Sequence, residues 1–214
     1  MAHIDDLATP ARRDFLKRFF HDIATPLSAV SLHLEGADRR VRRGIDPTES
    51  LTVARTELAK AFDLFDRGRE FLLEDPGPAA PFDLDPVAAA ATAEHPGVRL
   101  EGSTGASVTG SPKALAAALG ALIVNAIEAA GADSVRVLLG RDDGHVFARV
   151  ENPGSLQTDD TDALFSPKSA GKGKVWGMGL SRARVAAADA GGTVRLEQHG
   201  DRVVATLDLP EEPR

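Results

Sequence analysis

The sequence of 214 residues contains no cysteine, no long uninterrupted apolar run and no excess of basic residues. Without cysteine the chain can form neither a disulfide framework nor a thiolate metal site. The N-terminus lacks the apolar stretch of a secretory signal peptide, and the longest apolar run, ALAAALGALIVNAIEAA, is interrupted by Asn125 and Glu128. The net charge of -7 argues against nucleic acid as the main partner, because phosphate binding needs a basic surface. We therefore expect a soluble, cytoplasmic protein that binds neither nucleic acid nor membrane.

Residues 1–73 contain two series of apolar side chains at heptad spacing, which is typical of helices in a bundle. The first series ends before Gly44, and residues 46–49 then supply capping signals for a second helix. A hairpin of two such helices cannot bury its apolar stripes within one chain, so we predict a homodimeric four-helix bundle. The two series are Leu16, Phe20, Ile23, Leu27, Val30, Leu34, Ala37 and Val41, and then Leu51, Ala54, Leu58, Ala61, Phe65 and Leu72.

His21 lies outside these series, on a stripe of polar or small residues that should face solvent. Pro26 has no N–H to bond the carbonyl of Asp22, so the helix should bend one turn after the histidine. Neutral imidazole is a nucleophile near neutral pH, and an adjacent carboxylate can accept its proton. These residues therefore favour an exposed, slightly displaced imidazole that can act as a nucleophile.

The segment HDIATPL resembles the phosphoacceptor box of two-component histidine kinases. The resemblance implies that His21 is the phosphorylated histidine, that Asp22 is the acid that polarises it, and that Thr25 helps to orient a water molecule for dephosphorylation. It also implies that the partner is the receiver domain of a response regulator.

Three prolines and a glycine break the helical pattern, so residues 74–84 are predicted to be a linker and residues 85–214 a second domain. This domain should contain a long helix from Ser111 to Gly131, a strand hairpin that turns at residues 143–144, a helix over residues 180–190 and a final strand hairpin. Helices on one side of a mostly antiparallel sheet make an α+β sandwich, which is the fold class that we predict.

Segments of the second domain resemble the nucleotide-binding fold shared by histidine kinases, gyrase-type ATPases and Hsp90-type chaperones. LIVNAIEAA resembles the asparagine box, which implies that Asn125 binds the magnesium ion bridging the ATP phosphates; a core amide bonded to backbone is the alternative. GMGLSRARVAAADAGGTV resembles the second glycine box, in which Gly177 and Gly179 let backbone N–H groups approach phosphates. LFSPKSAGKGKVW between them implies a flexible lid hinged at Phe165. Its lysines, which could meet phosphate charge or serve only solubility, are Lys168, Lys172 and Lys174.

Other positions depart from the family pattern. In VENPGSL, Asn152 stands where the first glycine box has an aspartate that accepts the adenine amino group; Gly154 is retained and Leu156 replaces a second glycine. An asparagine oxygen can accept that hydrogen bond, but without the charge. Ala121 replaces the first asparagine of the asparagine box, and Val175 the leading glycine of the second glycine box. The affinity for ATP should therefore be reduced.

Two functions fit these features. In the first, the chain is a soluble histidine kinase core that uses ATP and magnesium to phosphorylate His21 and passes the phosphoryl group to an aspartate of a response regulator. In the second, it is an ATP-independent dimeric histidine phosphotransferase whose nucleotide domain is degenerate and which relays phosphate between receivers. A non-catalytic scaffold of the anti-sigma type would leave HDIATPL unexplained. The first function is favoured because Asn125, the glycines and the lysine-bearing segment occur together.

Overall fold

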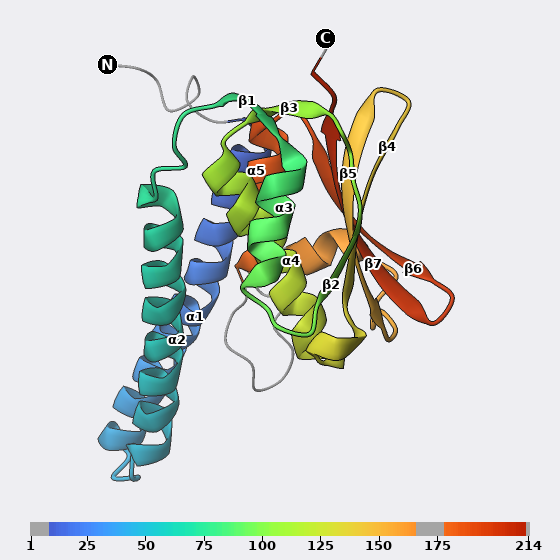
Figure 1. Ribbon diagram of the computed structural model, residues 1–214. Helices are drawn as coiled ribbons and strands as arrows, with labels where there is room; N and C mark the ends of the chain where they lie inside the picture. The colour runs from blue at the N-terminus through green and yellow to red at the C-terminus, as the bar shows by residue number, and fades with distance from the viewer. Residues whose placement is uncertain (1–8, 166–177, 213–214) are drawn as a thin grey trace, which may run out of the picture.

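The computed structural model describes residues 9–165 and 178–212. Its N-terminal part is a hairpin of two long antiparallel helices, α1 (Pro10–Arg42) and α2 (Thr48–Leu73), beside a compact C-terminal domain (Figure 1). The side chain of Thr9 accepts a hydrogen bond from the backbone N–H of Arg12, which caps α1, and α1 continues without interruption through Pro26. At the turn, the hydroxyl and backbone N–H of Thr48 donate to Asp46 Oδ1, and these bonds lower the pKa of the Asp46 carboxyl.

The stripe along which the two helices of the hairpin meet overlaps the predicted heptad series only in part. The buried positions are Phe15, Phe19, Asp22, Pro26 and Ala37 on α1, and Ala54, Ala61, Leu64 and Gly68 on α2. Ala37, Ala54 and Ala61 belong to the predicted series. Of its larger side chains, Leu16 and Ile23 are half-buried, whereas most of the others are exposed. Of the thirteen large hydrophobic side chains that are exposed in the described part of the chain, twelve lie on the hairpin or its turn: Phe20, Leu27, Leu32, Leu34, Val41, Ile45, Leu51, Leu58, Phe62, Phe65, Leu72 and Leu73.

The C-terminal domain is an α+β sandwich, as predicted. Its main sheet has five strands in the order β2-β4-β5-β7-β6, all paired antiparallel except β2 with β4. Helices α3, α4 and α5 cover one face of this sheet (Figure 1). The elements are β1 (Ala80–Asp83), α3 (Leu84–Ala93), β2 (Arg99–Gly102), β3 (Ser107–Gly110), α4 (Pro112–Ala130), η2 (Ala132–Ser134), β4 (Arg136–Asp142), β5 (His145–Pro153), η3 (Thr161–Phe165), α5 (Gly179–Asp189), β6 (Thr193–His199) and β7 (Arg202–Pro210). Strand β1 pairs with β3 and lies within residues 74–84, the predicted linker.

Helix α4 is the central helix of this domain. Among the described residues it is the one helix whose length and composition alone would allow it to cross a membrane, with 33% of its most apolar window buried. That is weak evidence, because the core helix of a soluble protein passes the same test. The side chains that α4 buries in the core are Leu115, Ala118, Leu119, Leu122, Ile123 and Ala126.

A second apolar cluster joins the hairpin to α5. Phe15 and Phe19 of α1 pack with Leu64 of α2 and with Met178 and Val185 of the C-terminal domain. The rings of Phe15 and Phe19 stack with their centroids 5.7 Å apart. Phe19 also lies directly on Gly68 of α2, where a Cβ atom would come within 2.0 Å of its ring. The absence of a side chain at position 68 therefore lets Phe19 reach α5.

We predict that Gly68→Ala destabilises the protein, although alanine is the better helix former. The added methyl group would displace the Phe19 ring, which should cost about 1–3 kcal/mol of unfolding free energy. Gly36→Ala in α1 is the matched control, because its Cβ would have only Ser50 Oγ at 3.8 Å and should gain up to about 1 kcal/mol from helix propensity. Urea unfolding measures both changes; equal stabilisation by the two substitutions would contradict the role given to Gly68.

Candidate functional site

His21 presents its imidazole to solvent on α1. The side chain is 74% exposed, and its Nδ1 lies 3.2 Å from Asp22 Oδ1. Thr25, one turn further, donates its hydroxyl hydrogen to the carbonyl oxygen of His21 at 3.1 Å. When Nδ1 carries the ring proton it donates to Asp22, and Nε2 is then the unprotonated nitrogen. The pair therefore can present a nucleophilic nitrogen to an incoming phosphoryl group.

Asp22 lies outside the predicted apolar series, yet it is buried in the hairpin. Only 3% of the residue is exposed, and it lies on the same stripe as Phe19 and Pro26. A carboxylate in this position is sheltered from water and salt, so its attraction for the neighbouring imidazole is stronger than on an open surface. Burial thus adds to the ability of Asp22 to orient His21.

The end of β5 places Asn152 on the buried side of the sheet, with 5% of the residue exposed. Its Nδ2 donates to the Pro153 carbonyl at 2.8 Å, which leaves Oδ1 as the free acceptor of the amide among the described residues. Gly154 follows with a φ of 141°, a conformation that disfavours any other residue. Asn152 is therefore held so that its oxygen can accept a hydrogen bond.

Gln198 of β6 fixes the chain after Gly154, and sequence reasoning missed it. Its Nε2 donates to the Gly154 carbonyl at 3.1 Å, while its Oε1 accepts from the Leu156 backbone N–H at 2.8 Å. The contact depends on the pairing of strands far apart in the sequence, so no local pattern indicates it. Gln198 holds the segment that the resemblance assigns to the first glycine box.

The structure brings the asparagine-box helix and the start of α5 together. Gly179 begins α5, and a Cβ atom at that position would lie 3.2 Å from the Cβ of Ala121 on α4. Asn125, one turn further along α4, is exposed, and its side chain makes no hydrogen bond to another described residue. The first N–H groups of a helix have no partner within it, so the start of α5 is suited to bind an anion beside Asn125.

A cleft of about 560 Å³ opens at this point between the hairpin and the C-terminal domain. Its lining comes from α2, α4 and the start of α5: Asp63, Asp66, Arg67, Glu70, Ala117, Ala121, Met178, Gly179 and Arg182. Among the described residues no group of three or more histidine or carboxylate side chains could hold a metal ion. A magnesium ion here would thus depend on the Asn125 amide oxygen and on the oxygens of its nucleotide.

Phe165, predicted at the hinge of the lid, is 4% exposed and fixed to α5. Ser181 donates its hydroxyl hydrogen to the Phe165 carbonyl at 2.5 Å, and the Arg184 guanidinium lies 3.9 Å from the ring centroid. The other predicted residues of this region lie outside the described residues: Lys168, Lys172, Lys174, Val175 and Gly177.

His21 does not lie in this nucleotide-type site. It follows Phe19 by two residues, which turns its side chain about 200° around the helix. Because Phe19 packs toward Met178 and Val185, the imidazole faces away from α5. The two predicted sites are therefore separate in this arrangement of the chain.

Comparison with known proteins agrees with this architecture. Residues 110–211 match the family model of the histidine kinase-, DNA gyrase B-, and HSP90-like ATPase. The nucleotide-free catalytic domain of histidine kinase ThkA is 21% identical with a TM-score of 0.56, covering 63% of this chain and 97% of that one. Acinetobacter baumannii histidine kinase AdeS is 17% identical with a TM-score of 0.54, covering 90% of this chain and 98% of that one. Among curated proteins, no sequence matches.

A further solved structure contains histidine kinase ThkA in complex with the response regulator protein TrrA. Its kinase chain is 19% identical with a TM-score of 0.58, and the match covers 94% of this chain and 62% of that one. At such identities the likeness establishes the fold, and the family model establishes the type of the C-terminal domain. Residues 110–211 thus match the family model of the histidine kinase-, DNA gyrase B-, and HSP90-like ATPase, and the hairpin together with the C-terminal domain has the fold seen in solved histidine kinases.

Proposed function

We propose that the chain is a histidine kinase core that phosphorylates His21 with ATP and passes the phosphoryl group to an aspartate of a response-regulator receiver domain. The observation that carries this proposal is the exposed His21, paired with the buried carboxylate of Asp22 in the same chain as an ATPase-type domain. The solved complex of ThkA with TrrA supports a response regulator as the class of partner.

The chemistry at His21 needs a nucleophile, a proton acceptor and a route for the proton. Nε2 attacks the γ-phosphorus, an N–P bond forms, the bond to the leaving oxygen breaks, and ADP departs. Positive charge develops on the ring during attack, and Asp22 stabilises it through Nδ1–H. Thr25, whose hydroxyl lies one turn from the histidine, would orient a water molecule when the phosphorylated partner is dephosphorylated.

The nucleotide site rests on polar groups at the ends of three elements. Asn152 Oδ1 would accept from the adenine amino group, and the N-terminus of α5 at Gly179 would face the phosphates. Magnesium, held by Asn125, would neutralise phosphate charge. The resemblance alone supports a role in phosphate binding for Lys168, Lys172 and Gly177.

The hairpin would dimerise through its outward apolar stripe. Exposed large hydrophobic side chains are rarely concentrated in this way on a monomer, since a contiguous apolar patch marks an interaction surface. A second copy of the hairpin would bury both stripes and complete a four-helix bundle with His21 still outside.

The ATP-independent phosphotransferase is the second candidate. It is favoured by the neutral Asn152, since the loss of a charged acceptor disfavours a nucleotide. Both candidates use His21 in the same way and differ only in the source of phosphate.

A nucleotide titration separates the two candidates. With magnesium present, ATP should bind; Asn125→Ala should abolish binding, because the metal loses its protein ligand, and Asn152→Asp should strengthen it about 10-fold by restoring a charged acceptor. Calorimetry measures each affinity. If the wild-type protein shows no heat at millimolar ATP, the phosphotransferase takes the place of the kinase.

Phosphorylation should occur on His21 whatever the phosphate source. Incubation with labelled ATP, or with a phosphorylated receiver, should give an acid-labile, base-stable adduct that His21→Gln removes and His33→Gln, on the same helix, retains. Asp22→Asn should slow its formation by about 100-fold, because it removes the charge that assists the imidazole. An adduct that persists in the His21→Gln protein would show that another residue is the acceptor.

The wild-type protein should be a dimer in light scattering at micromolar concentration. Leu27→Lys or Phe65→Lys should give monomers, because each places a charge in the stripe that the partner buries. Val124→Lys changes an exposed large hydrophobic residue outside the hairpin and should leave the dimer intact. A monomeric wild-type protein would refute the proposed bundle.

A further inference from the structure

Glu128 is the one acidic residue of α4, and it lies in the last turn of the helix. The helix dipole carries a partial negative charge at that end, so a carboxylate there lowers the stability of the helix. The other charged residue of α4, Lys113, is used by the fold, because its Nζ donates to the Asp75 carbonyl at 2.7 Å. Helix stability therefore does not explain the position of Glu128.

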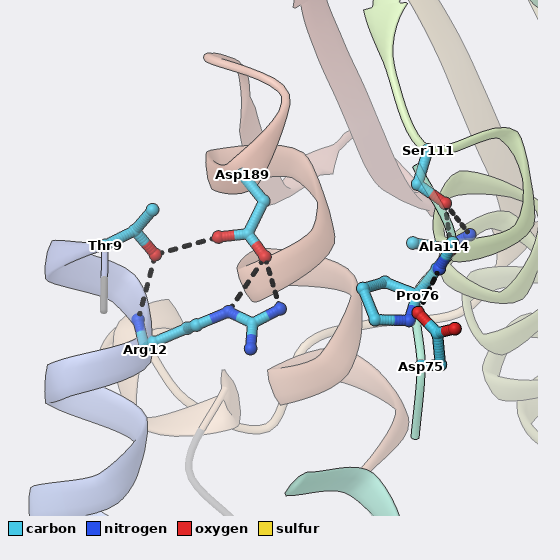
Figure 2. A network of polar contacts seen from close by, with 8 residues as sticks. Thr9, Arg12, Asp75, Pro76, Ser111, Ala114 and Asp189 are labelled. Atoms are coloured by element: carbon cyan, nitrogen blue, oxygen red, sulfur yellow. Dashed lines mark hydrogen bonds and ion pairs between the residues drawn. The ribbon is translucent and has the colours of Figure 1, made fainter. Parts of the chain in front are cut away.

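Polar groups at the other ends of α4 and α5 have structural partners. Ser111 caps α4 by accepting a hydrogen bond from the Ala114 backbone N–H at 3.1 Å, and it donates its hydroxyl hydrogen to the Pro76 carbonyl (Figure 2). Asp189 is the last residue of α5, so its carboxylate also lies at the unfavourable end of a helix. Arg12 of α1 offsets that charge, with its Nη2 2.7 Å from Asp189 Oδ2 (Figure 2). At the end of α5, an acid is thus accompanied by a cation.

Glu128 lies on the side of α4 that faces the start of α5. Ala117 and Ala121 line the cleft there, and Glu128 follows them by eleven and seven residues, close to three and two full turns. Asn125 lies between Ala121 and Glu128, and both polar side chains are exposed. Residues three apart on a helix have Cβ atoms about 5–6 Å apart. Asn125 and Glu128 are therefore neighbours on one face of α4.

The carboxylates of α2 at the same cleft are paired with arginines of their own helix. Asp63 Oδ1 lies 3.0 Å from Arg67 Nε, and Asp66 Oδ1 lies 3.7 Å from Arg69 Nη2. Glu128 instead shares a helix face with the asparagine of the proposed magnesium site. It is thus the acid whose position suits it to act on an ion bound at that asparagine.

We propose that Glu128 makes the nucleotide site selective for the magnesium complex of ATP over metal-free ATP. This inference rests on the proposed function and adds a residue to its magnesium site. Magnesium keeps several water molecules when it binds a protein together with a nucleotide. A carboxylate beside Asn125 attracts the ion and accepts hydrogen bonds from that water, whereas the neutral amide brings no charge. Without the ion, the same carboxylate faces the negative triphosphate. The effect of Glu128 on ATP binding therefore depends on the metal.

The experiment measures ATP binding by calorimetry in excess magnesium and in EDTA. The ratio of the two dissociation constants gives the coupling between metal and nucleotide, and a magnesium titration at fixed ATP gives the half-saturating metal concentration. Glu128→Gln keeps the shape of the side chain and removes its charge. Glu94→Gln is the matched control, because it removes the same charge from an exposed position at the end of α3.

In magnesium, Glu128→Gln should weaken ATP binding and raise the half-saturating magnesium concentration, each by about 10-fold, the lower end of the loss that follows removal of an outer partner of a bound metal. In EDTA the same variant should bind ATP no more weakly than the wild type. Glu128→Lys should bind ATP alike in both conditions, because the ammonium group supplies the positive charge of the ion. Glu94→Gln should match the wild type throughout.

Thermal unfolding without ligand checks the fold, and Glu128→Gln should not lower the midpoint, since it removes an unfavourable charge from the helix end. Equal weakening of ATP binding in magnesium and in EDTA would give Glu128 a structural role and overturn the inference alone. Tighter binding in both conditions would overturn it too, because Glu128 would then only repel phosphate. Absence of ATP binding in every variant and in the wild type would overturn the proposed kinase as well.

Discussion

The packing of the Phe19 ring onto Gly68 determines how the parts of this molecule are arranged. It lets α1 and α2 approach closely at one end of the hairpin and directs the ring toward Met178 and Val185 of α5. Helix α5 then carries the contact into the C-terminal domain, because its first residue, Gly179, rests on Ala121 of α4. A side chain at either glycine would separate the surfaces that it joins. The position of the nucleotide-type site relative to the hairpin thus depends on glycine at both positions.

Helix α1 serves three surfaces within one turn. Phe19 and Asp22 face the interior of the hairpin, Phe20 belongs to the outward apolar stripe, and His21 faces solvent between them. Each successive residue turns about 100° around the axis, so a shift of one position exchanges these surfaces. The histidine can be exposed beside a buried carboxylate because neighbouring residues of a helix point in directions about 100° apart. The proposed phosphoacceptor site therefore depends on helix geometry as well as on residue type.

The helices and turns could be predicted because their signals are local. Ser111 caps α4 and Gly131 ends it, and the turn at Asp143 and Gly144 has positive φ at both residues. The inner stripe of the hairpin was predicted only in part. The predicted series includes Ala37, Ala54 and Ala61, which are buried. The burial of Phe15, Phe19 and Asp22 depends on contacts with other elements, which hydrophobic periodicity within one helix does not encode.

The candidate site was predictable only where a motif is continuous in the sequence. HDIATPL and LIVNAIEAA placed His21 and Asn125, and both side chains are exposed on their helices. The Arg12 and Asp189 pair and the role of Gln198 depend on segments that meet only in the folded chain. No spacing rule relates such residues, so this part of the site could come only from the structure.

The glycines and the asparagines of the candidate nucleotide site differ in how far the fold itself explains them. Gly154 is required by its φ of 141°, and Gly179 by the close approach to Ala121, so the local backbone alone explains why glycine stands at both positions. Asn125 has no such explanation: its side-chain amide is exposed on a mostly apolar helix and has no hydrogen bond to another described residue. Likewise Asn152 uses its Nδ2 within the loop and leaves its oxygen without a donor among the described residues. Under the proposed function, Asn125 would bind the magnesium ion and Asn152 Oδ1 would accept a hydrogen bond from the adenine amino group.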